Sequence, residues 1–317
     1  MAKASEKNSN IIISEDGIEQ PISNKRLEVL KTYKIYIGGQ FPRTESGRYY
    51  LATNSNGEQL ANICLSSRKD FRDAVVAARS AFKSWSARAA FNRGQILYRI
   101  AEMLEGRKAQ FIEELTKQDV NKAAAQKEVT IAIDRLIWYA GWCDKYQQLF
   151  GTVNPVASSH FNFSVPEPSG VVAAIAPQDN SLLGLVSVIA PIIAGGNTCI
   201  VLASEAKPLC SITFAEVINS SDVPGGVINI LTGKVSELAT QFASHMDVNA
   251  LVYCGEDSVV QKELQTKGAA NVKRILIRKN INWFSEEGQS PYYIMDTQEI
   301  KTTWHPIENI GGGGGGY

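Results

Sequence analysis

Histidine is scarce in this sequence, and cysteine is scattered. The three histidines stand at positions 160, 245 and 305, and no two have the short spacing that protein zinc sites use. The cysteines form no Cys-x-x-Cys pair, so neither a thiolate metal site nor a redox dithiol is indicated. We expect reduced thiols, in mostly apolar surroundings, at Cys64, Cys143, Cys199, Cys210 and Cys254.

An excess of charge of either sign is also missing. Lysine plus arginine and aspartate plus glutamate each number 32, so no overall field attracts nucleic acid or an anionic membrane. No uninterrupted apolar run reaches the roughly 20 residues of a membrane span. The sequence also lacks a Gly-x-x-x-x-Gly-Lys-[Ser/Thr] phosphate loop and a Gly-x-Ser-x-Gly elbow. We therefore expect a cytoplasmic protein whose partners include neither nucleic acid nor membrane.

The most informative stretch runs from Val165 to Glu205. It contains two apolar strand candidates, 170–176 and 198–202, joined by a helix-length apolar run over 182–194. Parallel strands need such a long crossover, so the pattern predicts a βαβ unit. Ligands of such sheets bind at the carboxyl ends of the strands. After the first strand, this end is Pro177-Gln178-Asp179-Asn180.

The remainder of the chain repeats this alternation. Helices are predicted over 208–219 and 236–244, and strands over 227–231, 250–253 and 272–277. The sequence therefore predicts an α/β fold, a Rossmann-like, mainly parallel five-stranded sheet.

The N-terminal third precedes that sheet. Residues 1–30 are polar and without periodicity, which predicts a disordered arm. Tyr33 to Ile37 alternates like a half-buried strand. Apolar residues at three- and four-residue steps then predict an N-terminal helical segment, with Asp70 as the N-cap of its first helix. The predicted helices span 69–85, 89–104, 109–117 and 127–146.

Phe161 to Val165 alternates like an edge strand. Unpaired strand edges are sites of association, although a plain surface hairpin is the alternative. We predict an oligomer or a docked partner bound through such an edge.

The chain resembles the aldehyde dehydrogenases. Their corresponding segment reads approximately EPxGVVxxIxPWNFPLLxxxxxxxPALAxGNTVVLKPSE, and this sequence matches it at Glu167, Pro168, Gly170, Val171, Val172, Ile175, Pro177, Leu182, Leu183, Gly196, Asn197, Thr198, Ser204 and Glu205. The phrase DVPGGVINILTG is a further match. The resemblance implies a β-arm near 156–169 used for oligomerisation, and a C-terminal strand over Tyr292 to Trp304 that joins it. We therefore expect the oligomer or docked partner to bind through Phe161 to Val165 and Tyr292 to Trp304. The phrases WYAGWCDKYQQLFGTVNPV, LASEAKPL and EIKTTWHPI are similar to the second, catalytically degenerate module of family-16 aldehyde dehydrogenases.

The resemblance implies a thiohemiacetal mechanism, and the residues for it are missing. The family nucleophile stands in a Gly-Gln-x-Cys context, which does not occur here. The catalytic asparagine is replaced by Asp179, and Arg278 lies in the segment that carries the family's general base. The few dozen residues between the match ending near Arg274 and the one beginning at Gln298 cannot make a catalytic domain. We assign no catalytic residue.

The resemblance also implies NAD binding, with partial retention of the residues. The positions that correspond to the family's cofactor site are Pro177, Gln178, Asp179, Glu205, Gly233 and Gly255. Leu202 replaces the lysine that binds the adenine ribose, and Val260 replaces the second glycine of the Gly-x-x-x-x-Gly turn. Glu256 and Asp257 place negative charge where a diphosphate would lie, although acids at a helix start also serve as caps. We expect no bound cofactor, or at most weak NAD binding, and no metal.

These observations lead to three hypotheses. The first is a catalytically degenerate aldehyde dehydrogenase homologue that docks on itself or on a full-length aldehyde dehydrogenase as a structural or accessory subunit. The second is an NAD-dependent oxidoreductase acting on aldehydes with a borrowed cysteine or with Cys254. The third is a regulatory nucleotide-binding module. The expected domains are an arm (1–30), an NAD-binding-like domain (31–280), a return segment with an oligomerisation strand (281–310) and a flexible glycine-rich tail (311–317).

Overall fold

The computed structural model describes residues 11–13, 19–21 and 29–307. Residues 1–30 form a separate unit, in which strands β1 (Ile11–Ile13) and β2 (Glu19–Pro21) pair antiparallel. The predicted disordered arm otherwise falls outside the described residues, as does the predicted glycine-rich tail.

The centre of the second unit is a parallel five-stranded sheet with the strand order β10-β9-β8-β11-β12. Its strands are β8 (Val171–Ile175), β9 (Thr198–Leu202), β10 (Ile228–Leu231), β11 (Ala250–Tyr253) and β12 (Arg274–Ile277). The crossover helices are α6 (Leu183–Ala194), α7 (Leu209–Asn219), α8 (Val235–Ser244) and α9 (Ser258–Gly268). The predicted fold class is confirmed, with each strand and the helices α6, α7 and α8 within two residues of their predicted bounds, whereas no bounds were predicted for α9.

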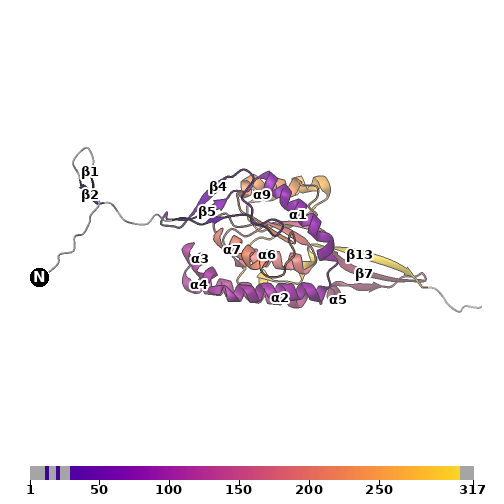
Figure 1. The fold of residues 1–317 in the computed structure, drawn as a ribbon. Coiled ribbons are helices and arrows are strands. Elements are labelled where there is room, and N and C mark those ends of the chain that lie inside the picture. The colour runs from indigo at the N-terminus through magenta and orange to yellow at the C-terminus, as the bar shows by residue number, and fades with distance from the viewer. Residues whose placement is uncertain (1–10, 14–18, 22–28, 308–317) are drawn as a thin grey trace, which may run out of the picture. The chain divides into compact units, whose positions relative to one another are not determined.

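Alternate residues of β8 explain why the sheet needs helices on both faces. Val172 and Ala174 join one core cluster, whereas Val171, Ala173 and Ile175 join the other. All five are fully buried or nearly so. In Figure 1, α2 and α4 lie on one side of the sheet, and α1 and α9 lie on the other. Burial on both faces explains why these strands read as continuous apolar runs.

The helices that precede the sheet are α1 (Arg68–Ser86), α2 (Ala90–Gly106), α3 (Lys108–Lys117), α4 (Lys122–Trp142) and α5 (Tyr146–Phe150). The predicted helix over 127–146 was therefore wrong at both ends. It begins five residues earlier because the Asn121 side chain accepts a hydrogen bond from the Ala124 amide and caps it. Asp70 is not the N-cap of α1 either. Ser67 is the N-cap, and Asp70 is the N3 residue, whose side chain completes a capping box with Ser67.

A small mixed sheet precedes α1. It has the order β3-β5-β4, from β3 (Thr32–Tyr33), β4 (Tyr49–Thr53) and β5 (Gln59–Cys64). The predicted strand over 33–37 was only partly right. β3 ends at Tyr33. Tyr36 instead pairs in an isolated bridge with Ile230 of the parallel sheet, and the two backbone N to O distances are 2.9 and 2.8 Å.

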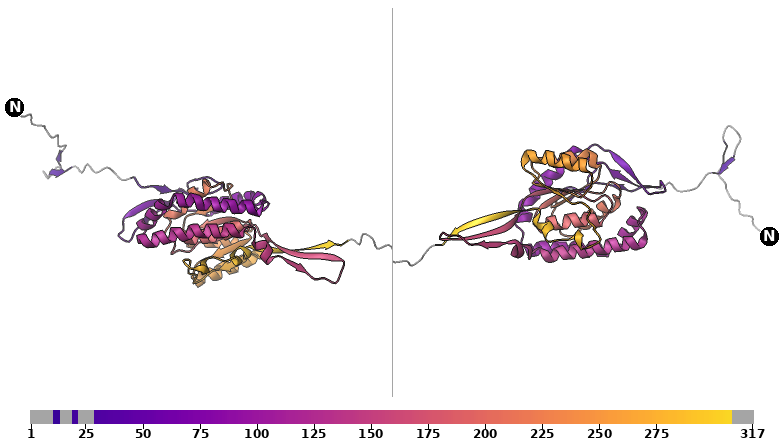
Figure 2. Two further views of the ribbon diagram at one scale, coloured as in Figure 1. Left: turned by 90° about the horizontal axis from the view of Figure 1, so that it is seen from below. Right: turned by 180° about the vertical axis from the view of Figure 1, so that it is seen from behind.

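A second antiparallel sheet, here called the arm, consists of β6 (Thr152–Asn154), β7 (His160–Pro168) and β13 (Gln298–Pro306). β7 and β13 pair over nine residues and run side by side away from the parallel sheet, as both views in Figure 2 show. β7 is therefore the central strand and not the predicted edge strand. The predicted strand over 292–304 was also wrong at its start, where Tyr292–Met295 forms helix α10.

Candidate functional site

The carboxyl ends of the parallel strands meet at one edge, and the predicted cofactor residues lie there. Pro177, Gln178 and Asp179 follow β8, Glu205 follows β9, and Gly233 and Gly255 follow β10 and β11. The strand order reverses direction between β8 and β11, the switch point where ligands of such sheets bind. All six residues therefore lie at one edge of the sheet, and what they do there depends on their contacts.

Gln178 ties the turn after β8 to the turn after β9. Its Oε1 accepts a hydrogen bond from the Glu205 amide at 2.8 Å, and its Nε2 donates to the Ala176 carbonyl at 2.9 Å. Its own carbonyl accepts from Ser204 Oγ at 2.8 Å. The amide side chain is thus engaged on both its oxygen and its nitrogen, and we interpret it as a structural joint.

Asp179 is exposed beside this joint. Its carbonyl accepts a hydrogen bond from Lys207 Nζ at 2.9 Å, and its carboxylate has no ion pair among the described residues. An ionised carboxylate accepts hydrogen bonds and donates none. Asp179 therefore cannot stabilise a developing oxyanion as a donor at this position.

The N-terminus of α6, directly after the turn, is already occupied by a carboxylate. Glu128 of α4 is 3% exposed, and its Oε1 accepts from the amides of Leu182 and Leu183 at 2.9 and 3.1 Å. The positive end of the helix dipole favours that negative charge. Glu128 was not among the residues predicted from the sequence, although an acid inside the buried stripe of α4 is a signal that could have revealed it.

Tyr253 fills the space beside Gly255. A Cβ built on Gly255 would collide with the Tyr253 hydroxyl. The space that the missing side chain of Gly255 leaves is therefore filled by Tyr253, so it is not open to a ligand. At the next helix start, Asp257 is the N-cap of α9, and its Oδ1 accepts from the amides of Val259 and Val260 at 2.8 and 3.3 Å. The interpretation of Asp257 as a cap is confirmed.

Leu202 ends β9 and is fully buried in one of the two core clusters. No donor extends from this position toward the edge. Of the pair that would hold an adenine ribose, only Glu205 is present.

Cys254 lies at the end of β11 and is 8% exposed. Burial raises the pKa of its thiol to about 12, and the nearby Arg278 guanidinium only partly opposes that shift. Because the thiolate is the nucleophile, a thiol with this pKa is almost entirely protonated at neutral pH. Cys254 therefore has the character of a structural thiol, like the other four cysteines, which are also free and buried.

Arg278 begins the segment of residues 278–297 that connects β12 to β13, here called the connecting segment. Its side chain is 5% exposed, its Nη2 lies 3.4 Å from Asp296 Oδ2, and its guanidinium carbon lies 3.9 Å from the centre of the Tyr293 ring. A guanidinium stays protonated at neutral pH and cannot accept a proton. Arg278 thus cannot serve as a general base.

The connecting segment is short and well attached. It contains a 3-10 turn at Glu286–Gly288 and helix α10, and it buries Trp283 and Ile294. Asn197 Nδ2 donates to the carbonyl and the hydroxyl of Thr297, at 2.9 and 3.2 Å. These residues lie against the parallel-sheet unit where the family resemblance implies an inserted catalytic domain.

The described residues contain neither a cluster of metal-ligating side chains nor a membrane-spanning helix. No group of three or more histidine, cysteine, aspartate or glutamate side chains in the described part is placed to hold a metal ion. None of the helices in that part combines the length and the apolar character needed to cross a membrane.

Comparison with known proteins places this fold. The aldehyde dehydrogenase family model matches residues 42–301. The chain belongs to the aldehyde dehydrogenase family. This confirms the resemblance found in the sequence, and the relatives below match only a part of their own length.

Among curated relatives, an aldehyde dehydrogenase of Enchytraeus buchholzi is 30% identical over 91% of this chain and 56% of its own length. The cytosolic 10-formyltetrahydrofolate dehydrogenase of Mus musculus is 29% identical over 82% of this chain and 30% of its own length. The chain thus spans just over half of the former relative and less than a third of the latter.

Solved structures give the same result for the fold. The NAD+ complex of an aldehyde dehydrogenase from Bacillus cereus matches with a TM-score of 0.74 and 24% identity, over 78% of this chain and 51% of that chain. That protein was solved with NAD+ bound, and NAD binding by the present chain depends on the residues at its own strand edge.

Proposed function

We propose that this chain is a catalytically degenerate member of the aldehyde dehydrogenase family that acts as a structural or accessory subunit. It docks through the arm onto a second copy of itself or onto a full-length aldehyde dehydrogenase. It has no dehydrogenase activity of its own, and interaction is its function. It acts as an oligomeric pseudoenzyme of the cytoplasm.

The observation that carries the docking proposal is the exposure of β13. Eight of its nine residues are exposed, and they include Ile300 and Trp304 at 54% and 57%. β13 is an outer strand of the arm, so its far edge has no strand partner in the described part of the chain. Exposed apolar side chains on an unpaired edge favour pairing with another chain.

The arm adds apolar surface on its opposite face. In the register of the arm, Val153 pairs with Phe163, and Phe161 lies two residues along β7. Val153 and Phe161 are 68% and 46% exposed. A partner that contacts the arm can therefore bury apolar side chains on either face while it pairs with the edge of β13.

The strand edge supports the absence of independent catalysis. Tyr253 blocks the approach to Gly255, Asp257 occupies the start of α9, and Leu202 offers no donor. An NAD diphosphate would meet two carboxylates, at Glu256 and Asp257, in place of free amides. The residues present do not fit NAD, and we derive no hydride transfer for this chain.

The alternative of an NAD-dependent oxidoreductase that uses Cys254 is disfavoured by the same geometry. The thiol is buried and protonated, and it lies beside a cation that cannot act as a base. The third hypothesis, a regulatory nucleotide-binding module, is disfavoured because the phosphates of a nucleotide at this edge would lie near the same two carboxylates, those of Glu256 and Asp257.

The docking proposal is tested by sizing. The purified chain is measured by size-exclusion chromatography with light scattering, alone and mixed with a full-length aldehyde dehydrogenase from the same source. We expect either a multiple of the 34.6 kDa chain mass when alone, or a complex larger than the dehydrogenase itself when mixed. Bovine serum albumin in place of the dehydrogenase is the control for non-specific association. A chain that stays monomeric in both samples, at protein concentrations of about 50 μM, contradicts the proposal.

A further inference from the structure

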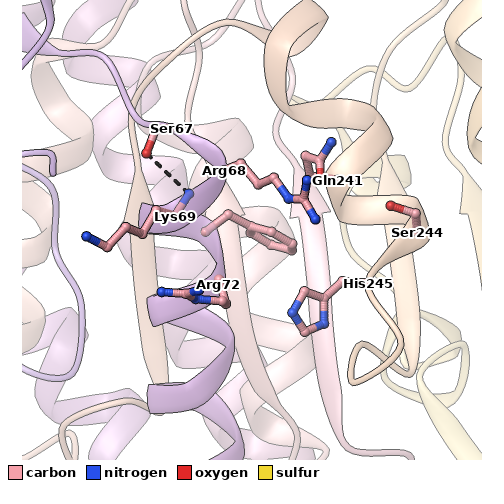
Figure 3. A pocket seen from close by; sticks show the side chains of 8 residues that line it. Ser67, Arg68, Lys69, Arg72, Gln241, Ser244 and His245 are labelled. Carbon is pink, nitrogen blue, oxygen red and sulfur yellow. Dashed lines mark hydrogen bonds between the residues drawn. The ribbon is translucent and has the colours of Figure 1, made fainter. Parts of the chain in front are cut away.

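A pocket lies between the first turns of α1 and the end of α8, and it shares no lining residue with the arm or with the strand-edge residues described above. It has a volume of about 510 Å³, within the range of small-molecule sites. It is lined by Ser67, Arg68, Lys69, Phe71, Arg72, Gln241, Ser244 and His245. Figure 3 shows that Arg68 reaches toward Gln241 of α8, whereas the charged ends of Lys69 and Arg72 point away from α8. We call it the basic pocket.

The lining is positively charged, and acids just outside it pair with two of its cations. Arg68, Lys69 and Arg72 supply three cations, and no aspartate or glutamate lines the basic pocket. Glu45 pairs with Lys69 at 2.8 Å, and Asp73 lies 3.5 Å from Arg72, so Arg68 is the lining cation that has no ion pair in the described part of the chain. Asp70 is turned inward and accepts from the amides of Glu45 and Ser67 at 2.8 and 2.7 Å. The positive end of the α1 dipole adds to this potential.

Several donors in the basic pocket have no protein partner. Within the described part of the chain, no hydrogen bond or ion pair engages the Arg68 guanidinium, the Gln241 amide or the Ser244 hydroxyl. His245 Nδ1 accepts from the Asp247 amide at 3.2 Å, so the neutral ring carries its proton on Nε2 and is a further donor. Burial, Lys273 and Arg68 all lower the pKa of His245, which favours this neutral form.

The floor of the basic pocket is fixed. Phe71 is 1% exposed and stacks on Phe242 with the ring centres 4.2 Å apart, and the His245 ring meets Phe71 edge-on at 5.7 Å. Lys273 Nζ donates to the carbonyls of Phe242 and His245, at 3.1 and 2.9 Å, and holds the end of α8 in place. The walls are therefore held in position without a ligand.

We infer that the basic pocket binds the phosphate group of a small organic phosphate. Arginine guanidinium groups pair with phosphate oxygens through two parallel hydrogen bonds, and amide, hydroxyl and imidazole donors complete the coordination of such a group. The volume exceeds that of phosphate alone, so the remainder of the ligand has room between α1 and α8. This site goes beyond the proposed docking function, since it shares no residue with the arm.

The test is a titration of the full chain with inorganic pyrophosphate by isothermal calorimetry at constant ionic strength. We expect one saturable site with a Kd below about 1 mM. R68Q is expected to weaken binding at least tenfold. K83Q, which removes a cation from the exposed last turn of the same helix, should leave the Kd unchanged.

A second variant approaches the basic pocket from the other wall. S244D places a carboxylate opposite Arg68 at an exposed position of α8, and it should also weaken pyrophosphate binding at least tenfold. Melting temperatures of all variants establish that they are folded. Absence of saturable binding, or binding that R68Q and S244D leave unchanged, overturns the inference.

Discussion

Replacing Trp304 with aspartate is expected to weaken assembly through the arm by at least about 100-fold, which corresponds to about 2.7 kcal/mol. Trp304 is 57% exposed, and its ring has one aromatic neighbour among the described residues, His160, at 5.8 Å. Exposed tryptophans at the centre of an interface carry a large share of its binding energy. A charge at this position would have to be desolvated on docking, which adds to the loss.

The matched control is Tyr98→Asp. Tyr98 has the same 57% exposure but lies on α2, outside the arm. The dissociation constant of the assembly is measured by sedimentation velocity over a range of concentrations. Both variants should keep the melting temperature of the parent within a few degrees, because neither side chain is in the core. If Trp304→Asp assembles as tightly as the parent, the arm is not the docking surface.

Replacing Asn197 with alanine is expected to lower the free energy of unfolding by about 2–4 kcal/mol. Asn197 is fully buried, and its Oδ1 accepts from the Gly170 amide at 2.9 Å. Its Nδ2 donates to Thr297 in the connecting segment. Alanine would leave the Gly170 amide buried without an acceptor and would release the attachment of the connecting segment to the parallel sheet.

Asn56→Ala serves as the control, since Asn56 is exposed and such a change typically stays within about 0.5 kcal/mol. Urea denaturation at one fixed protein concentration gives both values, because assembly makes the apparent stability depend on concentration. Asn197→Asp should be no better than alanine. It keeps the acceptor for Gly170 but sets a carboxylate against the Thr297 carbonyl. A loss below about 1 kcal/mol for Asn197→Ala would contradict the assigned role.

The parallel sheet was predictable from the sequence because its strands are buried on both faces. The run at Ala250–Tyr253 has four consecutive buried residues, and its predicted bounds match β11. The residues after each strand were also predictable as neighbours, since parallel strands place their carboxyl ends together. The partner of the arm remains a prediction.

Other elements depended on contacts that a local pattern does not contain. Phe161 to Val165 alternates as a half-buried strand should, but the alternation does not say that β6 and β13 pair on its two sides. Tyr292 to Met295 has the aromatic and β-branched content of a strand, yet the turn at Pro291 starts a short helix that packs Ile294 into the core. In each case tertiary contacts decided the outcome over local propensity.

The candidate site divides in the same way. The replacements at Asp179 and Leu202 were visible in the sequence. The packing of the Tyr253 hydroxyl beside Gly255 was not, because it depends on the path of the chain after β11. The capping of α6 by Glu128 requires α4 to lie against α6, 54 residues away in sequence.

The most direct test of the proposed absence of dehydrogenase activity is a calorimetric titration of the isolated chain with NAD. A full-length aldehyde dehydrogenase is the positive control, and NADH formation from acetaldehyde is followed in parallel. We predict no saturable heat up to about 1 mM NAD and no NADH, because Tyr253, Asp257 and Leu202 leave the diphosphate and the ribose without partners. Saturable binding in the micromolar range, accompanied by NADH formation from the isolated chain, would contradict it.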